Sequence, residues 1–233
     1  MKAMILAAGR GERMRPLTDD CPKPLLPVAG RPLIARQIDA LRAAGITDIV
    51  INTAWRGERL VQALGDGGAL GVTIAWSHES EALETGGGIA TALPLLGAEP
   101  FIAVSGDVFA DYDYAALAAR APALIGDHSD VHLVLVPNPD FHPGGDFALG
   151  EGGRLARRAA GAASYTFGNI GLYHPRLFAG RAPNVRFKLL ELYLAAIDAG
   201  RAGAELFEGA WHNLGTPDQL AALDRELAAR AAA

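Results

Sequence analysis

The chain contains a single cysteine, Cys21, among its 233 residues. One thiol can neither close an internal disulfide nor begin a zinc site built from several cysteines. No stretch approaches the roughly 20 apolar residues that a membrane helix needs, and the apolar run at the N-terminus breaks at Gly9, too early for a signal peptide. The sequence therefore predicts a protein of a reducing compartment, the cytoplasm, with no membrane partner.

Positive charge is also in short supply, since 21 Lys and Arg against 26 Asp and Glu leave a net charge of −5. A general nucleic-acid binder normally carries a basic surplus, so that class is excluded. Low-complexity tracts and internal repeats are absent, and the composition, 50% hydrophobic and 20% charged, is typical of a folded globular protein. An anionic ligand must therefore meet a local cluster of cations, which the sequence supplies as Arg10, Arg13, Arg15 and Lys23.

Apolar runs alternate with helical spacings along the first half, which predicts strands at 3–6, 48–52, 72–76 and 101–105 and helices at 33–44, 58–64 and 88–95. This alternation is typical of a parallel sheet. The second half predicts strands at 131–136, 147–149 and 166–173 and helices from about 188 to 199 and from 217. We predict one α/β domain with a Rossmann-like, doubly wound mixed sheet, whose smaller part, about 126–233, forms a mixed lobe against the sheet of about 1–125.

Ligands of such sheets bind at the carboxyl ends of the strands, here the loops after Leu6, Asn52 and Ser105. The first of these loops reads Gly-Arg-Gly-Glu-Arg-Met-Arg at 9–15, and two glycines let main-chain N–H groups approach an anion closely. A dinucleotide fingerprint would need glycine where Met14 stands, and a P-loop would need Gly-Lys followed by a hydroxyl residue. Both motifs are excluded, which leaves a phosphate cradle or a plain glycine-rich turn with solvated arginines.

Lys23 stands between Pro22 and Pro24, which restrict its backbone to an extended segment. Solubility explains a lysine held in this way poorly. A point charge aimed at a phosphate, whose developing negative charge it would stabilise, explains it well. The continuation of the loop therefore favours the phosphate cradle.

The segment Leu-Ala-Ala-Gly-Arg-Gly-Glu-Arg-Met-Arg-Pro-Leu-Thr at 6–18, followed by Pro-Lys-Pro-Leu at 22–25, resembles the signature of the sugar-nucleotide pyrophosphorylases. These are nucleoside triphosphate:sugar-1-phosphate nucleotidyltransferases. Segments 51–55, 84–88 and 145–147 are most similar to the N-acetylmuramate 1-phosphate uridylyltransferases of bacterial cell-wall recycling. The resemblance implies the nucleotidyltransferase fold, Mg²⁺ as cofactor, a nucleoside triphosphate (UTP favoured) and a sugar 1-phosphate as partners, and a nucleotide-binding first part and sugar-binding second part.

For the nucleotide, the resemblance places Arg15 on the β and γ phosphates, Lys23 on the α-phosphate, and main-chain groups of Leu6 and Ala8 on the base. The segment Glu-Thr-Gly-Gly-Gly at 84–88 would line the base and sugar pocket. A flexible helix entry capped by threonine is the competing interpretation of that run. The expected nucleotide-binding residues are Leu6, Ala8, Gly9, Gly11, Glu12, Arg13, Arg15, Lys23, Thr85 and Gly86.

For the metal, Asp107 follows an apolar strand and is similar to the metal aspartate of the family, so Arg15, Lys23 and Asp107 form the expected catalytic set. The second metal ligand of the family is an aspartate in Trp-x-Asp-x-Gly-Thr, whereas this chain has Asn213 in Trp-His-Asn-Leu-Gly-Thr. An amide oxygen can bind Mg²⁺ but brings no negative charge, so this metal site is expected to be weaker. His212 is expected to be structural, because Mg²⁺ prefers oxygen ligands.

For the sugar phosphate, Lys188 stands at the start of an expected helix, where a lysine opposes the helix dipole and suits an incoming phosphate. A merely solvated lysine is the competing interpretation. The resemblance completes the expected sugar-phosphate site as Asn52, Gly87, Ser105, Gly145, Asp146, Asn169 and Lys188.

The resulting hypothesis is an in-line attack of the sugar phosphate on the α-phosphorus, without a covalent intermediate or a general base. Three alternatives stay open. One is a pyrophosphorylase of other specificity, such as guanylyl transfer to mannose or heptose 1-phosphate, or a UDP- or dTDP-glucose type. The others are a catalytically weakened sugar-nucleotide sensor, which Asn213 suggests, and a plain nucleotide-binding module. The chain is expected to be a monomer or a small homo-oligomer.

Overall fold

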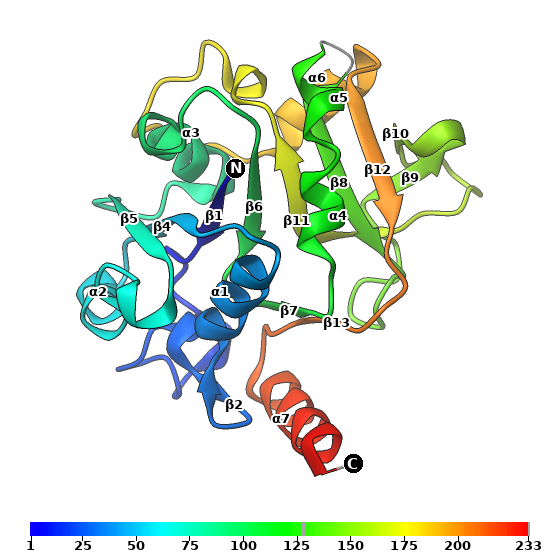
Figure 1. Ribbon diagram of the computed structural model, residues 1–233. Helices are drawn as coiled ribbons and strands as arrows, with labels where there is room; N and C mark the ends of the chain where they lie inside the picture. The colour runs from blue at the N-terminus through cyan, green and yellow to red at the C-terminus, as the bar shows by residue number, and fades with distance from the viewer. Residues whose placement is uncertain (127–128, 233) are drawn as a thin grey trace.

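The computed structural model describes residues 1–126 and 129–232. At its centre lies one nine-stranded mixed sheet with the order β5-β4-β1-β6-β11-β8-β12-β10-β9 (Figure 1). Two small sheets, β2–β3 and β7–β13, lie outside it. The strands are β1 Lys2–Leu6, β2 Pro27–Val28, β3 Arg31–Pro32, β4 Asp48–Thr53, β5 Thr73–His78, β6 Phe101–Ser105, β7 Val108–Ala110, β8 Val131–Val136, β9 Phe147–Gly150, β10 Arg154–Arg157, β11 Thr166–Tyr173, β12 Ala202–Leu206 and β13 Trp211–Asn213.

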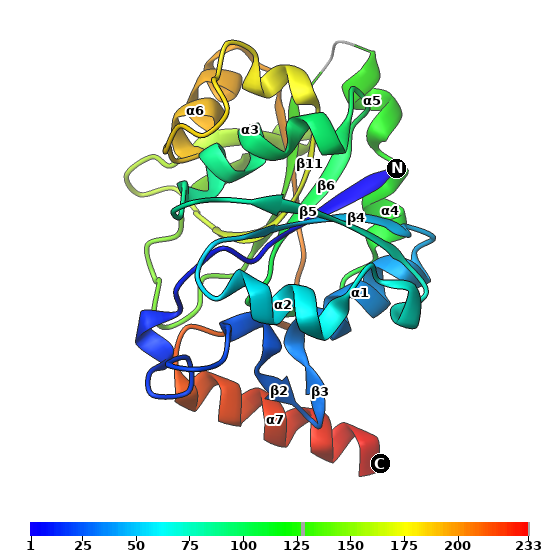
Figure 2. The ribbon, with the colours of Figure 1, turned by 90° about the vertical axis from the view of Figure 1, so that its left-hand side faces the viewer.

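Helices cover both faces of the large sheet. Figure 2 shows α1 and α2 on one side of the sheet and α3 and α6 on the other. The strands bury alternate residues in two separate cores, so that Ile5 of β1 packs in the cluster that contains α1 and α2, while Met4 packs in the cluster that contains α3 and α6. The helices are α1 Leu33–Ala43, α2 Gly57–Leu64, α3 Glu84–Leu96, α4 Tyr114–Ala118, α5 Ala121–Ile125, α6 Leu190–Asp198 and α7 Pro217–Ala232.

The first half of the sheet is parallel, because β4 and β6 both pair in parallel with β1, and β5 pairs in parallel with β4. This confirms the prediction from continuous apolar runs, which are typical of parallel strands buried on both faces. The second half is mixed, since β11 runs antiparallel to β6 and β8 while β12 runs parallel to β8. The predicted single α/β domain with a mixed sheet is confirmed, and the strands of the second part extend the sheet of the first part instead of packing against it.

Two helices begin away from their predicted positions. Helix α3 begins at Glu84, four residues before the expected start, so the glycine run 86–88 lies inside its first turns. Helix α6 begins at Leu190, so Lys188 lies in the segment before it. Within the described ranges, every helix is too short or too polar to span a lipid bilayer.

Helix α7 brings the end of the chain back to its beginning. Leu223 of α7 is fully buried and packs in one cluster with Val28 and Leu33, and Asp224 accepts a hydrogen bond from the Ala29 N–H at 2.7 Å. This packing holds β13, which directly precedes α7, beside the turn that follows β6.

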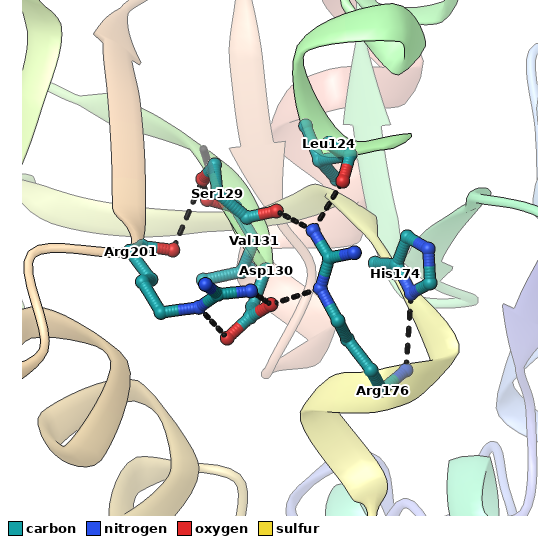
Figure 3. A network of polar contacts seen from close by, with 7 residues as sticks. All are labelled: Leu124, Ser129, Asp130, Val131, His174, Arg176 and Arg201. Carbon is teal, nitrogen blue, oxygen red and sulfur yellow. Dashed lines mark hydrogen bonds and ion pairs between the residues drawn. The ribbon is translucent and has the colours of Figure 1, made fainter. Parts of the chain in front are cut away.

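Asp130 lies at the amino end of β8, at the opposite end of the strands from β13. It connects its own segment with the segment before β12 and the segment after β11 (Figure 3). Arg201 donates to both carboxylate oxygens, at 2.8 and 2.7 Å, and Arg176 donates to Oδ1 at 2.5 Å. Arg176 also donates to the carbonyl oxygens of Leu124 and Ser129. Burial by itself raises the pKa of Asp130, but the two guanidiniums outweigh it and hold that pKa below its usual value.

Candidate functional site

A cleft of about 620 Å³ opens at the carboxyl ends of β1, β4 and β6. The loops that follow these strands supply its floor, as the position of ligands in parallel sheets predicts. Eleven of the residues expected from the sequence line it, which are Leu6, Ala8, Gly9, Gly11, Glu12, Arg13, Lys23, Asn52, Thr85, Ser105 and Asp107.

The glycine-rich loop leaves β1 and turns into a short 3-10 helix, Glu12–Met14. Gly11 begins this helix with φ of 65°, a left-handed conformation that favours glycine. A Cβ at this position would lie 3.0 Å from Thr18 Cγ2, and the Thr18 hydroxyl donates to the Gly11 carbonyl at 2.8 Å. Met14 is completely buried and anchors the loop. The loop thus presents its main chain and the side chains of Arg10 and Arg13 to the cleft.

The arginines of this loop divide into two groups. Arg10 and Arg13 line the cleft, and the Arg10 guanidinium lies 5.5 Å from the centre of the Trp55 ring, where the two groups attract each other. Arg15 lies outside the cleft. Its side chain is 65% exposed and pairs with Asp19 at 3.1 Å. The structure therefore does not bring Arg15 together with Lys23 and Asp107.

Lys23 and Asp107 meet at the floor of the cleft, 84 residues apart in the sequence. The Lys23 ammonium donates to Asp107 Oδ2 at 2.6 Å, and Lys23 is only 9% exposed. Lys23 begins a short 3-10 helix, Lys23–Leu25, so the extended segment expected from Pro22 and Pro24 is corrected. The turn that carries Asp107 is tied to β1, since the Gly106 N–H donates to the Leu6 carbonyl at 2.8 Å. A cation and a carboxylate held this close can serve a phosphate and a metal ion on neighbouring sites.

Asn213 lies next to this pair in space. Strand β13 pairs with β7 so that Asn213 faces Val108, and the Leu214 N–H donates to the Asp107 carbonyl at 2.9 Å. The buried Asn213 Oδ1 has no hydrogen-bond partner among the described residues. A buried acceptor without a donor is costly, so this oxygen fits a cation ligand beside Asp107.

His212, which precedes Asn213, faces the protein. Its Nε2 lies 3.1 Å from Glu226 Oε2 of α7, and its ring centre lies 6.1 Å from the centre of the Phe109 ring. The structural role expected for this histidine agrees with these contacts.

The glycine run 86–88 allows close packing within the chain. A Cβ at Gly86 would lie 2.4 Å from the Phe187 ring, and a Cβ at Gly87 would lie 2.3 Å from the Val185 carbonyl oxygen. Gly86 and Gly87 therefore let segment 185–187 of the same chain approach closely, because a side chain at either position would collide with it. Thr85, at the start of the run, lines the cleft, whereas Gly86 and Gly87 are buried behind it.

The remaining expected sugar residues lie outside the lining of the cleft. Gly145 (φ 58°) and Asp146 form a loop tied to β11, because Asp146 accepts the Phe167 N–H at 2.8 Å. Asn169 (φ 56°) lies at the irregularity of β11, and Lys188 is exposed before α6. The structure does not bring these four together with Lys23 and Asp107.

Glu79 and Arg186 also line the cleft and were not predicted, and Glu84 lines it as part of the segment 84–88 that was expected there. Glu79 directly follows β5, so the strand-end rule that indicated Asn52 would have found it. Arg186 pairs with Glu84 at 2.8 Å across 102 residues of sequence, and no local pattern indicates such a pair.

Glu79 is 6% exposed and receives hydrogen bonds from Asn52 Nδ2 at 2.6 Å and from the Leu83 N–H at 3.0 Å. Burial raises its pKa, although both hydrogen bonds act in the opposite direction. A group of three or more His, Cys, Asp or Glu side chains that could hold a metal does not occur in residues 1–126 and 129–232. Metal binding in this cleft would therefore depend on few protein ligands and on the oxygens of a substrate.

Comparison with known proteins agrees with this geometry. Residues 2–157 match the family described as nucleotidyl transferase. The N-acetylmuramate alpha-1-phosphate uridylyltransferase of Neisseria meningitidis serogroup B is 48% identical, over 93% of this chain and 94% of that protein. The protein of the same name from Caulobacter vibrioides is 36% identical, over 97% of this chain and 96% of that protein.

A solved structure from Bacillus anthracis, a candidate glucose-1-phosphate thymidylyltransferase in complex with sucrose, superposes with a TM-score of 0.83. It covers 97% of this chain and 94% of its own, and at 22% identity the likeness concerns the fold alone. The family match and the two relatives cover the strand-end loops that form the cleft. The chain belongs to the nucleotidyl transferase family.

Proposed function

We propose that the protein forms UDP-N-acetylmuramate and pyrophosphate from UTP and N-acetylmuramate 1-phosphate. The observation that carries this proposal is the Lys23–Asp107 pair at the floor of a strand-end cleft, in a chain 48% identical to a uridylyltransferase of that name. The reaction would return a cell-wall sugar to peptidoglycan synthesis. Because UTP is a cytoplasmic metabolite and the one thiol needs no oxidising compartment, the proposed location is the cytoplasm.

The triphosphate would lie along the glycine-rich loop. The fixed main chain of Gly9 and Gly11, with the guanidiniums of Arg10 and Arg13, can neutralise the β and γ phosphates. Lys23 would hold the α-phosphate, where negative charge grows during transfer. The contact of Arg15 with these phosphates stays a prediction, because its side chain lies outside the cleft and pairs with Asp19.

Mg²⁺ fits the oxygen ligands beside Lys23. The Asp107 carboxylate and the unpartnered Asn213 Oδ1 would hold it, with water and phosphate oxygens completing the shell. When bound, the ion would neutralise phosphate charge and orient the triphosphate. Before it binds, the Lys23–Asp107 ion pair keeps both charges compensated.

The sugar phosphate would enter from the second part of the chain. About residues 1–125 would bind the nucleotide and about 126–233 the sugar, with Lys188 on the acceptor phosphate, Gly145, Asp146 and Asn169 along the sugar, and Ser105 contributing from the first part. Gly87 is buried against segment 185–187, so a sugar contact is not proposed for it. The attacking phosphate oxygen is already anionic at neutral pH and needs no proton removed. Transfer then depends on alignment of the two phosphates and on charge neutralisation by Lys23.

The test is a panel of triphosphates and sugar 1-phosphates given to the purified protein with Mg²⁺, with pyrophosphate release as the readout. The greatest kcat/KM is expected for UTP with N-acetylmuramate 1-phosphate. A higher value for GTP with mannose or heptose 1-phosphate would establish the other specificity. Absence of release with every pair would overturn the enzymatic proposal.

The weakened sensor is favoured by one observation, the neutral Asn213 in place of a carboxylate. Asn213→Asp adds a negative ligand and is expected to lower the Mg²⁺ concentration for half-maximal rate by several-fold, with kcat changed by less than about tenfold. A gain in kcat of about a hundredfold or more would support the sensor and contradict a competent enzyme.

A further inference from the structure

Asn52 and Glu79 form a largely buried polar chain in the wall of the cleft, apart from the phosphate loop and the Lys23–Asp107 pair. The Ala7 N–H donates to Asn52 Oδ1 at 2.7 Å, Asn52 Nδ2 donates to Glu79 Oε1 at 2.6 Å, and the Leu83 N–H donates to Glu79 Oε2 at 3.0 Å. Asn52 and Glu79 are 3% and 6% exposed. This relay therefore joins the exit of β1 to the entry of α3.

Each bond of the relay has a fixed direction. The main-chain N–H groups at its two ends can only donate, so Asn52 must turn its oxygen to Ala7 and its amide hydrogens to Glu79. Glu79 then receives a donor on each oxygen, and only an ionised carboxylate offers two acceptors. A glutamine or a protonated acid would set a donor against a donor, and a buried donor without an acceptor is costly.

The relay is also tightly packed. A Cβ at Gly88 would lie 2.8 Å from Asn52 Nδ2 and 2.8 Å from Glu79 Oε1, so α3 rests directly on the two side chains. A change in the relay must therefore move α3 relative to β1. The residues that would move, Leu6 to Ala8 and Leu83 to Thr85, all line the cleft.

Building on the proposed function, we propose that Asn52 and Glu79 are positioning residues that set the selectivity for the nucleobase. They fix the spacing of the two main-chain segments between which the base would lie. Main-chain donors and acceptors read a base edge only by their positions, and a displacement of about 0.5 Å is enough to spoil such a constellation. Asn52, expected from the sequence to contact the sugar, thereby acts through Ala7, because its amide is engaged at both ends.

The first variant is Glu79→Gln, which keeps the shape and places one donor against another. We expect the KM and the calorimetric Kd for UTP to rise by about tenfold or more, because one buried donor loses its acceptor. The preference for UTP over GTP should shrink, while kcat at saturation stays within about threefold, since the transferring groups are untouched.

The second variant is the double change Asn52→Asp with Glu79→Gln. The carboxylate now stands at position 52, where it accepts from the Ala7 N–H and from the amide at position 79, whose oxygen accepts from the Leu83 N–H. Every donor again meets an acceptor, so the KM for UTP and the base preference should return to within about threefold of the unchanged protein.

The matched control is Asp130→Asn, another carboxylate-to-amide change at a largely buried ion, at the opposite end of the strands (Figure 3). It is expected to lower the melting temperature and leave the KM for UTP and the base preference unchanged. This separates positioning of the base site from general loss of stability.

Three results would overturn the proposal: Glu79→Gln with unchanged KM and preference, a loss confined to kcat, or a double variant no better than Glu79→Gln. If Glu79→Gln fails to fold, the double variant decides alone. If the unchanged protein binds UTP but releases no pyrophosphate, the proposed reaction is wrong. The role of Asn52 and Glu79 is then tested by the calorimetric Kd of the variants for UTP and GTP alone. Protein that binds no triphosphate overturns both.

Discussion

The amino ends and the carboxyl ends of the parallel strands differ in how they hold a buried carboxylate. At the amino ends, Asp130 is surrounded by two guanidiniums, which hold its pKa below the usual value. At the carboxyl ends, Glu79 is surrounded by neutral donors, and burial raises its pKa. One end of the strands thus compensates a buried carboxylate with two cations, whereas the other holds a buried carboxylate with neutral donors that belong to the lining of the cleft.

The largest effect is expected at the cleft. Lys23→Met removes the cation proposed for the α-phosphate and should lower kcat for pyrophosphate release by about 10²–10³-fold, the usual loss when a preorganised charge is removed from a transition state. The melting temperature should change little, because the partner Asp107 is partly hydrated. A kcat within tenfold of the unchanged protein would contradict the assigned role and weaken the contrast between the two ends of the strands.

The next effect concerns stability at the amino ends of the strands. Asp130→Asn leaves Arg176 and Arg201 without their shared carboxylate and should lower the free energy of unfolding by about 3 kcal/mol. For a chain of this length the melting temperature should fall by about 6–12 °C, measured by calorimetry. Loss of kcat with an unchanged melting temperature would show that this end of the strands also serves the reaction.

Within the phosphate loop, Arg13 and Arg15 should differ. Arg13→Ala removes a charge that lines the cleft and should raise the KM for UTP by about tenfold. Arg15→Ala breaks an exposed pair with Asp19 and should change that KM by less than about twofold, because surface ion pairs contribute little. The reverse order would mean that the loop moves Arg15 into the cleft on binding.

The smallest expected effect is a pH dependence of stability, which should differ in sign between Glu205 and Glu79. The His132 ring, whose Nε2 lies 3.5 Å from Glu205 Oε2, lowers the pKa of Glu205 to about 2 from its usual 4.5, aided by a hydrogen bond from Tyr112 and by Arg120 at 2.5 Å. Its contribution to stability is therefore present above pH 4.5 and lost as the pH falls from 4.5 to 2. Melting curves should show this loss, and Glu205→Gln should flatten it.

Glu79 should respond with the opposite sign. Its pKa is raised in the fold, so protonation at falling pH relieves the cost of burying the charge and adds stability. The same protonation removes an acceptor from the relay, so UTP affinity should fall at a pH where the Glu205 contribution is still intact. Calorimetric titrations with UTP at several pH values, beside melting curves, test this difference.

The parallel half of the sheet could be predicted because each strand is a continuous apolar run between loops. Strands β10 and β12 were missed, since Arg154–Arg157 and Ala202–Leu206 are short and mix small with charged residues. The start of α3 was missed because three consecutive glycines disfavour a helix by themselves, and here contacts with Val185 and Phe187 hold them in one.

The sequence by itself indicated the glycine-rich loop and the lysine between two prolines, because glycine permits and proline restricts backbone conformations locally, whatever surrounds them. Only the tertiary structure decided which charges meet. Lys23 reaches Asp107, Glu79 reaches Asn52, and Arg186 reaches Glu84 through the order of strands in one sheet. Such pairs depend on packing between distant segments, and no local preference of the chain encodes them.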